Sequence, residues 1–229
     1  MSPRKKEQNE QIRESRRQQI LDSALSSYVR LGYNGTDMDQ VALQAGLTKG
    51  LVYYYFKTKR ELFRAVFEWM MMQGMEFSKE ILDFKSEMSS VECLVKYSLK
   101  ICSLAFEDPR MMQFYMRMPF DAYSIFGPEQ WKDGVDQSFM HRNALVQIIR
   151  EGIDKGELPP MDASFAANCF WSVFVSSLFD FTRLIVGQED VSRDIDTEDE
   201  NCRFEKIMRF CFSGLGLQDD NWKKYLVEK

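Results

Sequence analysis

The segment from Thr36 to Phe63, TDMDQVALQAGLTKGLVYYYFKTKRELF, constrains the fold of this chain more than any other. Gly46 interrupts a helical pattern of apolar residues, which predicts a tight turn between two short helices. Asp37 and Thr48 are good capping residues and stand where these two helices should begin. Thr58 starts a capping box that opens a third helix. The segment therefore predicts a helix-turn-helix.

The second short helix is expected to present a polar and aromatic face to solvent. Val52 and Phe56 are four residues apart and should pack inward, which leaves Lys49, Tyr53 and Tyr54 pointing outward. Cationic side chains bind phosphates, and a helix fits the major groove of a DNA duplex. This arrangement predicts DNA binding.

Charge is distributed unevenly along the chain. The first 60 residues carry 11 basic and 6 acidic side chains, whereas the remaining residues carry 19 basic and 29 acidic ones. This asymmetry predicts a phosphate-facing head and a body that repels DNA. Arg4 to Lys6 form a basic arm that either contacts DNA or is a solvated terminus. Arg16 and Arg17 either neutralise phosphates or belong to an exposed polar face.

Helical periodicity runs through the chain and strand signals are almost absent, which predicts an all-α fold. We expect residues 1–65 to form the helix-turn-helix domain and residues 66–229 a helical body. A long helix from residue 58 to about residue 84 should link the two. The other expected helices are residues 8–31, 88–107, 109–118, 128–155, 162–186, 201–215 and 219–227. The acidic residues 187–201 are expected to form a solvated loop.

Residues 163–186 are apolar on nearly every side, so this helix should be buried on several faces. Residues 201–215 are similarly apolar, and the two segments suit a four-helix interface between two copies of the chain. A large core within one chain is the alternative. The longest uncharged run has 17 residues, and a membrane helix needs about 20. We therefore expect no membrane segment.

The N-terminus is polar, so we expect no signal peptide and a cytoplasmic protein. The five cysteines include no CxxC pair and stand in apolar helical contexts. They are expected to be small buried hydrophobic residues in a reducing compartment. His141 is the only histidine, so neither a metal site nor a set of catalytic residues can be assembled, and we expect no cofactor and no enzyme activity.

Many residues in the first third of the chain match, at fixed spacing, the pattern of a known protein family. They are Gly32-Tyr33, Thr36, Val41-Ala42, Ala45-Gly46, Thr48-Lys49-Gly50, Val52 to Phe56, Lys59 and Glu61-Leu62. This pattern resembles the TetR family of bacterial transcriptional regulators over about residues 10–65. The resemblance implies a homodimer that dimerises through its last two long helices and a body that binds a small molecule. It favours a ligand-responsive repressor that a small molecule releases from a palindromic operator in double-stranded DNA.

The same resemblance implies the DNA-binding residues, with Gly50 allowing a close approach of the backbone. These residues are Thr36, Thr48, Lys49, Gly50, Leu51, Tyr53, Tyr54, Tyr55 and Lys59. Leu51 can touch only a thymine methyl group, so we expect specificity to rely on DNA shape. Asp37 stands where relatives often have Ser or Thr. Its carboxylate would repel a phosphate, so we expect no DNA contact there.

The body is rich in methionine and aromatic residues, which suit an apolar or aromatic ligand. The residues expected to line its pocket are Tyr115, Met116, Phe120, Met140, Phe170, Trp171 and Phe174. The alternative is that they are ordinary core residues. A further alternative is a DNA-binding regulator whose body binds a protein partner, with the acidic residues Glu189 to Glu200 as the contact.

Overall fold

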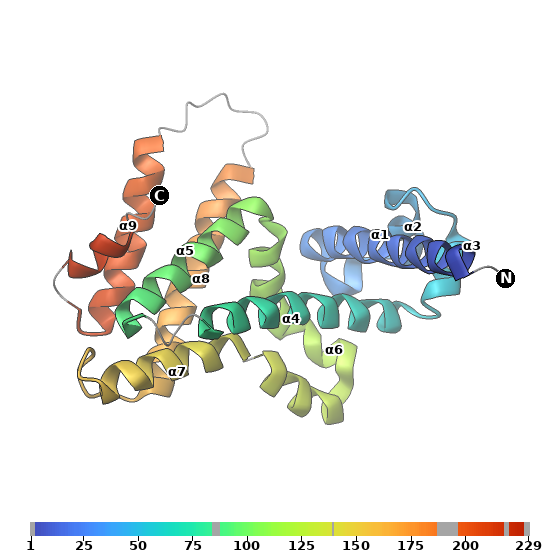
Figure 1. Cartoon of the computed structure of the whole chain (residues 1–229). Helices are drawn as coiled ribbons and strands as arrows, with labels where there is room; N and C mark the ends of the chain where they lie inside the picture. Colours follow the sequence, from blue (N-terminus) through green and yellow to red (C-terminus); the bar gives the residue numbers. More distant parts are fainter. Residues whose placement is uncertain (1–2, 84–87, 139, 187–196, 218–219, 227–229) are drawn as a thin grey trace. The chain divides into compact units, whose positions relative to one another are not determined.

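The computed structural model describes residues 3–83, 88–138, 140–186, 197–217 and 220–226. Every regular element within these ranges is helical (Figure 1), which confirms the predicted all-α fold. The elements are α1 (Pro3–Gly35), α2 (Met38–Gln44), α3 (Lys49–Tyr55), α4 (Lys59–Asp83), α5 (Ser90–Glu107), α6 (Arg110–Ser138), α7 (Met140–Asp154), α8 (Ala163–Val186), α9 (Thr197–Gly214) and a 3-10 helix η2 (Asp220–Tyr225). The acidic residues 187–196 lie outside the described residues.

The chain divides into two compact units, which are described separately below. Unit 1 contains residues 1–72 and 113–135, and unit 2 contains residues 73–112 and 136–229. Unit 1 therefore holds α1, α2, α3, the first part of α4 and most of α6. Unit 2 holds α5, α7, α8, α9 and η2. Helices α4 and α6 each contribute residues to both units.

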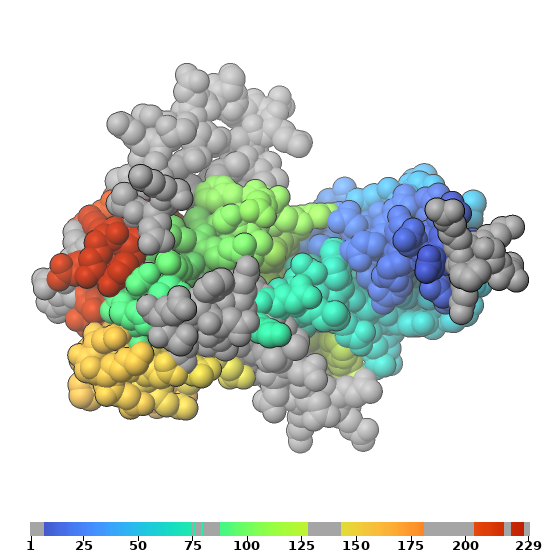
Figure 2. All heavy atoms as spheres, in the orientation of Figure 1, coloured from blue at the N-terminus to red at the C-terminus, as the bar shows by residue number. Residues whose placement is uncertain are grey.

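The core of unit 1 is an aromatic cluster built on α1. Tyr28 is fully buried, and its ring centroid lies 5.6 Å from those of Phe63 and Phe67 on α4 and 5.7 Å from that of Phe114 on α6. Burial of one such side chain contributes roughly 1.5–3 kcal/mol. The buried stripe of α1 contains Ile20, Ala24, Leu25 and Tyr28, and Leu31 one turn further on is exposed. Side chains of α1 and α4 form much of the visible face of this unit (Figure 2).

The regular part of α1 ends at Gly32, whose φ of 74° and ψ of 178° break the helix. Arg117 of α6 donates hydrogen bonds from Nη1 to the carbonyl oxygens of Tyr28 (3.3 Å) and Val29 (2.9 Å). These carbonyls belong to the last turn, where intrahelical partners are missing. The end of α1 is thus held by a side chain from α6 in the same unit.

Helix α6 differs from its prediction, which ended a helix at residue 118. The helix continues through Pro119 and breaks only at Gly127, where φ is 80°. Figure 1 shows the resulting bend. Arg64 of α4 donates to the carbonyl oxygens of Ile125 and Phe126, both at 3.3 Å, and so caps the first part of α6. The helix predicted over residues 128–155 is divided between the second part of α6 and α7.

In unit 2, α7 packs against α5 and α8, while α8 also packs against α9 and η2 packs against α5. Phe212 of α9 is buried between two rings. It stacks on Trp222 of η2 with a centroid distance of 5.1 Å and meets Phe170 of α8 edge-on at 5.9 Å. These contacts tie the C-terminal residues to the core of the unit.

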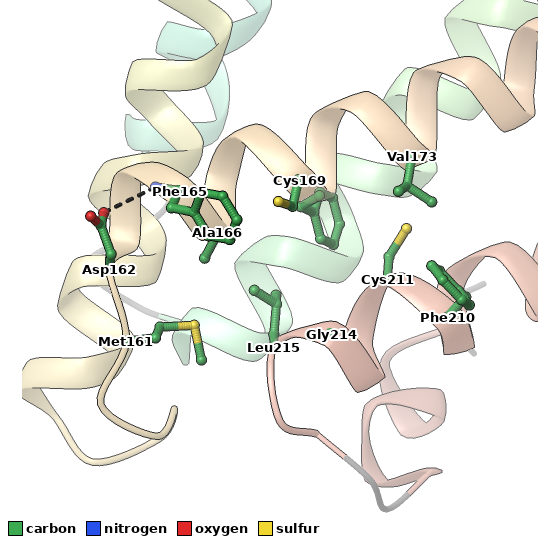
Figure 3. Close-up of a pocket in the computed structure, with 11 residues that line it drawn as sticks. Met161, Asp162, Phe165, Ala166, Cys169, Val173, Phe210, Cys211, Gly214 and Leu215 are labelled. Atoms are coloured by element: carbon green, nitrogen blue, oxygen red, sulfur yellow. Dashed lines mark hydrogen bonds between the residues drawn. The ribbon is translucent and has the colours of Figure 1, made fainter.

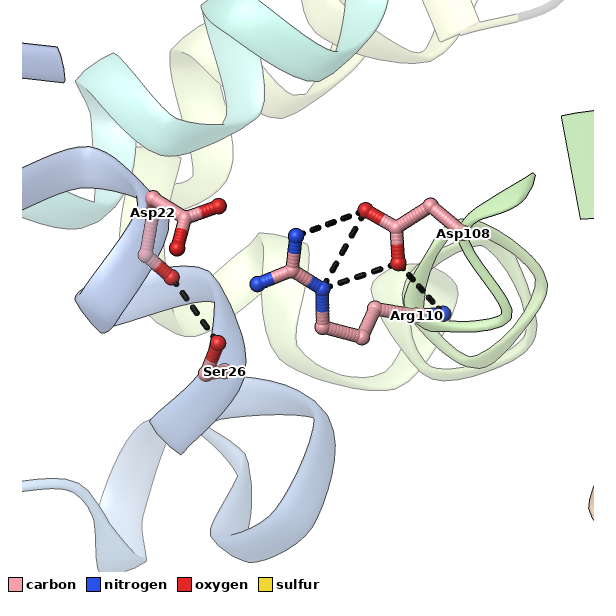
Figure 4. A network of polar contacts seen from close by, with 4 residues as sticks. All are labelled: Asp22, Ser26, Asp108 and Arg110. Carbon is pink, nitrogen blue, oxygen red and sulfur yellow. Dashed lines mark hydrogen bonds and ion pairs between the residues drawn. The ribbon is translucent and has the colours of Figure 1, made fainter. Parts of the chain in front are cut away.

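Local polar contacts support helices in each unit (Figure 4). At the start of α6, Arg110 binds Asp108 in a bidentate manner, with Nη2 2.7 Å from Oδ2 and Nε 2.8 Å from Oδ1. Asp108 also accepts a hydrogen bond from the Arg110 backbone N–H at 3.0 Å, so it caps the helix. In α1, the Ser26 hydroxyl donates to the Asp22 carbonyl oxygen at 3.1 Å.

Three of the cysteines behave as predicted. Cys93, Cys102 and Cys211 are buried, and burial raises the thiol pKa of both Cys102 and Cys211 to about 12. Cys169 is exposed, which corrects the expectation that every cysteine is buried. The side chain of Cys202 lies outside the described residues. Within the described ranges, no helix has the length and apolar character that a membrane span requires.

Candidate DNA-binding surface

Helices α2 and α3 begin with the predicted capping contacts. Asp37 Oδ1 accepts a hydrogen bond from the Asp39 backbone N–H (2.9 Å), and Thr48 Oγ1 accepts one from the Leu51 N–H (3.3 Å). Gly46 has a φ of 65° in the turn between the helices. Glycine adopts this left-handed conformation without the strain that other residues suffer. The sequence pattern thus produces two short helices with well-defined ends.

The inner faces of α2 and α3 are apolar and pack into unit 1. Val41 and Val52 are fully buried and Phe56 is nearly so, as the periodicity predicted. Side chains from α1 add polar contacts to the end of α2. Gln19 Nε2 donates to the Ala45 carbonyl oxygen at 2.6 Å, and the Ser27 hydroxyl donates to Gln44 Oε1 at 2.8 Å.

The outer face of α3 carries the predicted aromatic residues. Tyr54 is 61% exposed, Tyr53 is also exposed, and Tyr55 and Leu51 are half-buried. The Tyr54 and Tyr55 rings meet edge-on at 5.4 Å. Lys57 Nζ lies 5.7 Å from the centroid of the Tyr54 ring, within cation–π range. One exposed face therefore combines two aromatic rings with cations.

Each lysine around this face already has a partner within the chain. Lys49 Nζ lies 2.6 Å from Asp39 Oδ2. Lys59 Nζ donates to the Asn34 carbonyl oxygen at 3.2 Å and lies 4.7 Å from the centroid of the Tyr33 ring. Partial burial lowers the pKa of Lys59. The exposed lysines of this surface are therefore less available to phosphates than the sequence alone suggests.

Two further predicted residues differ in their surroundings. Thr36 is buried, and its hydroxyl donates to the Gly32 carbonyl oxygen at 2.8 Å. This hydrogen bond stabilises the connection between α1 and α2, and it already uses the Thr36 hydroxyl hydrogen. Gly50 is helical and exposed, and a Cβ added there would meet nothing within 4 Å. Among the residues that the structure describes, none makes a contact that requires glycine at position 50.

The start of α4 adds a reciprocal cap that fixes its junction with α3. Glu61 N–H donates to Thr58 Oγ1 at 3.1 Å, as the capping-box prediction requires. The Glu61 carboxylate accepts from the Lys57 backbone N–H at 2.8 Å.

The sequence did not predict the ion pair between Asp39 and Lys49, because the pair joins two helices and has no helical spacing.

The residues predicted to line a ligand pocket fall into both units. In unit 1, the Tyr115 hydroxyl donates to the Met70 carbonyl oxygen at 3.2 Å, burial raises the pKa of Tyr115, and Met116 is half-buried. Phe120 is 83% exposed. In unit 2, Phe170 and Phe174 are buried, and Trp171 is half-buried. The Met140 side chain lies outside the described residues.

A pocket of about 330 Å³ lies between α8 and α9 in unit 2 (Figure 3). Its wall is mostly apolar, and Phe165 and Phe210 at its rim are each 69% exposed. The lining residues are Met161, Asp162, Phe165, Ala166, Cys169, Phe170, Val173, Phe210, Cys211, Gly214 and Leu215. Asp162 is occupied as the cap of α8, because its Oδ1 accepts from the Ser164 and Phe165 N–H groups at 2.9 and 3.0 Å. The described residues contain no group of three side chains suited to a metal ion.

Comparison with known proteins agrees with this geometry. Residues 20–66, which run from within α1 to the first part of α4, match the bacterial regulatory proteins of the tetR family. The chain is 27% identical over 185 residues to the HTH-type transcriptional regulator SrpR of Pseudomonas putida, covering 74% of this chain and 76% of the relative. The chain belongs to the TetR family. Its relatives are transcriptional regulators and not enzymes. This chain is likewise a helix-turn-helix transcriptional regulator and not an enzyme.

Two further matches have a name or title that mentions fatty acids or a fatty acyl compound. The chain is 29% identical over 143 residues to the fatty acid metabolism regulator protein of Bacillus subtilis, covering 61% of this chain and 69% of that protein. The structure of the regulator FadR from Bacillus subtilis in complex with stearoyl-CoA aligns with a TM-score of 0.63 and 22% identity. That alignment covers 86% of this chain and 98% of the FadR chain. At this identity the structural match supports the fold alone.

Proposed function

We propose that this TetR-family regulator represses transcription by binding a palindromic operator as a homodimer, and that a small apolar or aromatic ligand releases it. The observation that carries the DNA-binding part is the exposed Tyr53–Tyr54 face of α3. This helix is short, capped and packed on α2 through buried residues, so its outer face is presented rigidly. A rigid helix of this kind suits insertion into a major groove.

The proposed contacts divide into two groups. Thr48, Lys49 and Gly50 stand at the start of α3, where backbone N–H groups and side chains can bind phosphates. Leu51 and the tyrosines reach base edges, thymine methyl groups or phosphates, and Lys59 binds a phosphate. Thr36 contributes by fixing the start of α2. The full proposed set is Thr36, Thr48, Lys49, Gly50, Leu51, Tyr53, Tyr54, Tyr55 and Lys59.

Selection of fragments from the host genome tests the DNA-binding proposal. The wild type is compared with the Tyr54→Ala/Lys59→Ala variant and with Tyr123→Ala. Tyr123 is 56% exposed on α6, so its loss controls for removal of an exposed tyrosine in the same unit. We expect the wild type and Tyr123→Ala to enrich the same palindromic site and the double variant to enrich none. Equal enrichment by all three proteins would contradict the proposed surface.

We further propose that α8 and α9 form the dimer interface and that the protein works in the cytoplasm. Exposed Phe165 and Phe210 support this choice of interface, because exposed phenylalanines rimming an apolar pocket are typical of association surfaces. In this view residues 1–65 bind DNA, and residues 66–229 bind the ligand and dimerise. The two-fold symmetry of such a dimer matches the two-fold symmetry of a palindrome.

For the ligand, we propose a long-chain acyl compound as the first class to test. The similarity to the Bacillus subtilis fatty acid metabolism regulator supports this choice. Of the residues expected to line a pocket, Phe170 lines the pocket described in unit 2, and it is the ligand contact that we propose there. Stearoyl-CoA added to the operator complex should release the protein, whereas CoA alone should not. If neither acyl nor aromatic compounds release it, a protein partner for the body becomes the better hypothesis.

A further inference from the structure

The proposed recognition helix, α3, begins with a lysine that already forms an ion pair within the chain. Lys49 is the first residue of α3, and its Nζ lies 2.6 Å from Asp39 Oδ2 on α2. Lys49 Nζ also lies 5.8 Å from the centroid of the Tyr53 ring. Lys49 Nζ donates a hydrogen bond to the Asp39 carboxylate, which raises the pKa of Lys49, so the lysine stays charged. Before DNA arrives, the lysine therefore has a carboxylate where a phosphate would bind.

This contact is readily exchanged. Both side chains are at least half exposed, and exposed ion pairs contribute little to stability because water screens them and both side chains lose freedom. Asp39 is not the capping residue of α2, since that role belongs to Asp37. Neither the fold nor the cap therefore needs the Asp39 carboxylate to remain bound to Lys49.

An occupied lysine contributes less to DNA binding than a free one. Non-specific binding is driven by cations that replace counterions on phosphates. A lysine already neutralised by a carboxylate adds nothing to that process until the pair is broken. An operator complex that places Lys49 on a phosphate must break the pair as well, so the cost of the exchange is subtracted from operator binding too. Asp39 also places a negative charge next to any phosphate at this position.

We propose that Asp39 is an affinity-setting residue: it acts as an internal phosphate mimic that occupies Lys49 and lowers the affinity of the protein for DNA. The cost of breaking the pair falls on every complex in which Lys49 binds a phosphate, the operator complex included. The inference rests on the proposed DNA-binding role of α3. It goes beyond that role by assigning a function to an acidic residue of α2.

The test measures affinity for the selected operator and for a random duplex of equal length, over a range of salt concentrations. The central variant is Asp39→Asn. Its matched control is Asp37→Asn, which removes the same charge two residues away and retains a good capping residue. Freeing one lysine should steepen the salt slope on random DNA by about 0.9, which corresponds to about an eightfold gain at ~0.1 M salt relative to about 1 M salt. The operator affinity should also rise, because the operator complex no longer has to break the pair.

A second comparison isolates the pair. In the Lys49→Ala background, Asp39→Asn should give no larger gain on random DNA than Asp37→Asn gives. The inference is overturned if Asp39→Asn and Asp37→Asn have equal effects with Lys49 present, or if the gain persists without Lys49. Tyr54→Ala separates the two levels of the argument. If Tyr54→Ala leaves operator binding intact, the proposed DNA-binding surface itself is wrong. If Tyr54→Ala abolishes operator binding but the effect of Asp39→Asn does not depend on Lys49, only the proposed role of Asp39 is wrong.

Discussion

At the scale of single residues, Gly50 is the position where an effect on stability and an effect on DNA binding can best be told apart. Alanine at this helical position should stabilise the protein by about 0.5–1 kcal/mol, because glycine loses more backbone entropy on folding. A Cβ there meets nothing within 4 Å in the chain, but it would stand between α3 and DNA. We expect Gly50→Ala to raise the melting temperature and to weaken operator binding by about tenfold. Unchanged affinity would show that the backbone does not approach DNA at this point.

Lys59 requires two substitutions, because its contacts within the chain and its proposed phosphate contact must be separated. Lys59→Ala removes the side chain from the Tyr33 ring and from the Asn34 carbonyl oxygen. Lys59→Met removes the ammonium group and its contacts but retains most of the aliphatic stem. We expect both variants to flatten the salt slope of operator binding by about 0.9, and Lys59→Ala to lower the melting temperature more than Lys59→Met does. A slope equal to that of the wild type would exclude the phosphate contact.

The residues that sequence reasoning placed correctly are those whose environment follows from helical spacing. Val52 and Phe56 are buried while Tyr53 and Tyr54 are exposed, because the period of one helix decides both. The Asp39–Lys49 pair depends on how α2 crosses α3, which spacing within a helix cannot show.

At the scale of elements, the end of α1 joins two parts of unit 1 and can be tested through Gly32. Its φ of +74° strains any residue with a side chain, and an added Cβ would lie 3.1 Å from Arg117 Nε. We expect Gly32→Ala to reduce the free energy of unfolding by at least 1–2 kcal/mol, roughly the penalty for the left-handed conformation. Urea denaturation measures the change.

Arg117→Ala supplies the control for this position. Alone, it should also destabilise the protein by about 1–3 kcal/mol, because the Tyr28 and Val29 carbonyls lose a donor. Combined with Gly32→Ala, it should make that substitution less harmful without making it neutral, since the backbone strain persists. Strict additivity of the two effects would show that the guanidinium does not crowd position 32.

The ends of the helices were predictable where a local signal sets them and less so elsewhere. Asp37, Thr48 and Thr58 cap their helices as expected, because a cap is a contact between neighbours in sequence. The break in α6 was expected near Pro119 and occurs at Gly127. Helix α6 instead continues through Pro119 to Phe126, where Arg64 of α4 caps its carbonyls. That support comes from a helix about 60 residues away in sequence.

At the scale of the whole molecule, the apolar excess of residues 163–186 indicated a helix with more than one covered face. The structure accounts for part of this excess within unit 2, where Phe170 and Phe174 are buried. It leaves Phe165 of α8 and Phe210 of α9 exposed around the pocket between the two helices. A second copy of the chain is the partner that we propose for these residues.

The proposed interface makes a quantitative prediction about assembly. In an isologous dimer each substitution occurs twice, and burial of one phenylalanine contributes roughly 1.5–3 kcal/mol. Phe165→Glu or Phe210→Glu should therefore weaken dimerisation by about two orders of magnitude or more, as measured by sedimentation. Phe120→Glu is the control, because Phe120 is 83% exposed but belongs to α6 in unit 1. A monomer presents only one recognition helix, so the two interface variants should also lose most of their affinity for a palindrome while retaining weak binding to half-sites. Variants that stay dimeric would require a different surface to join the two copies.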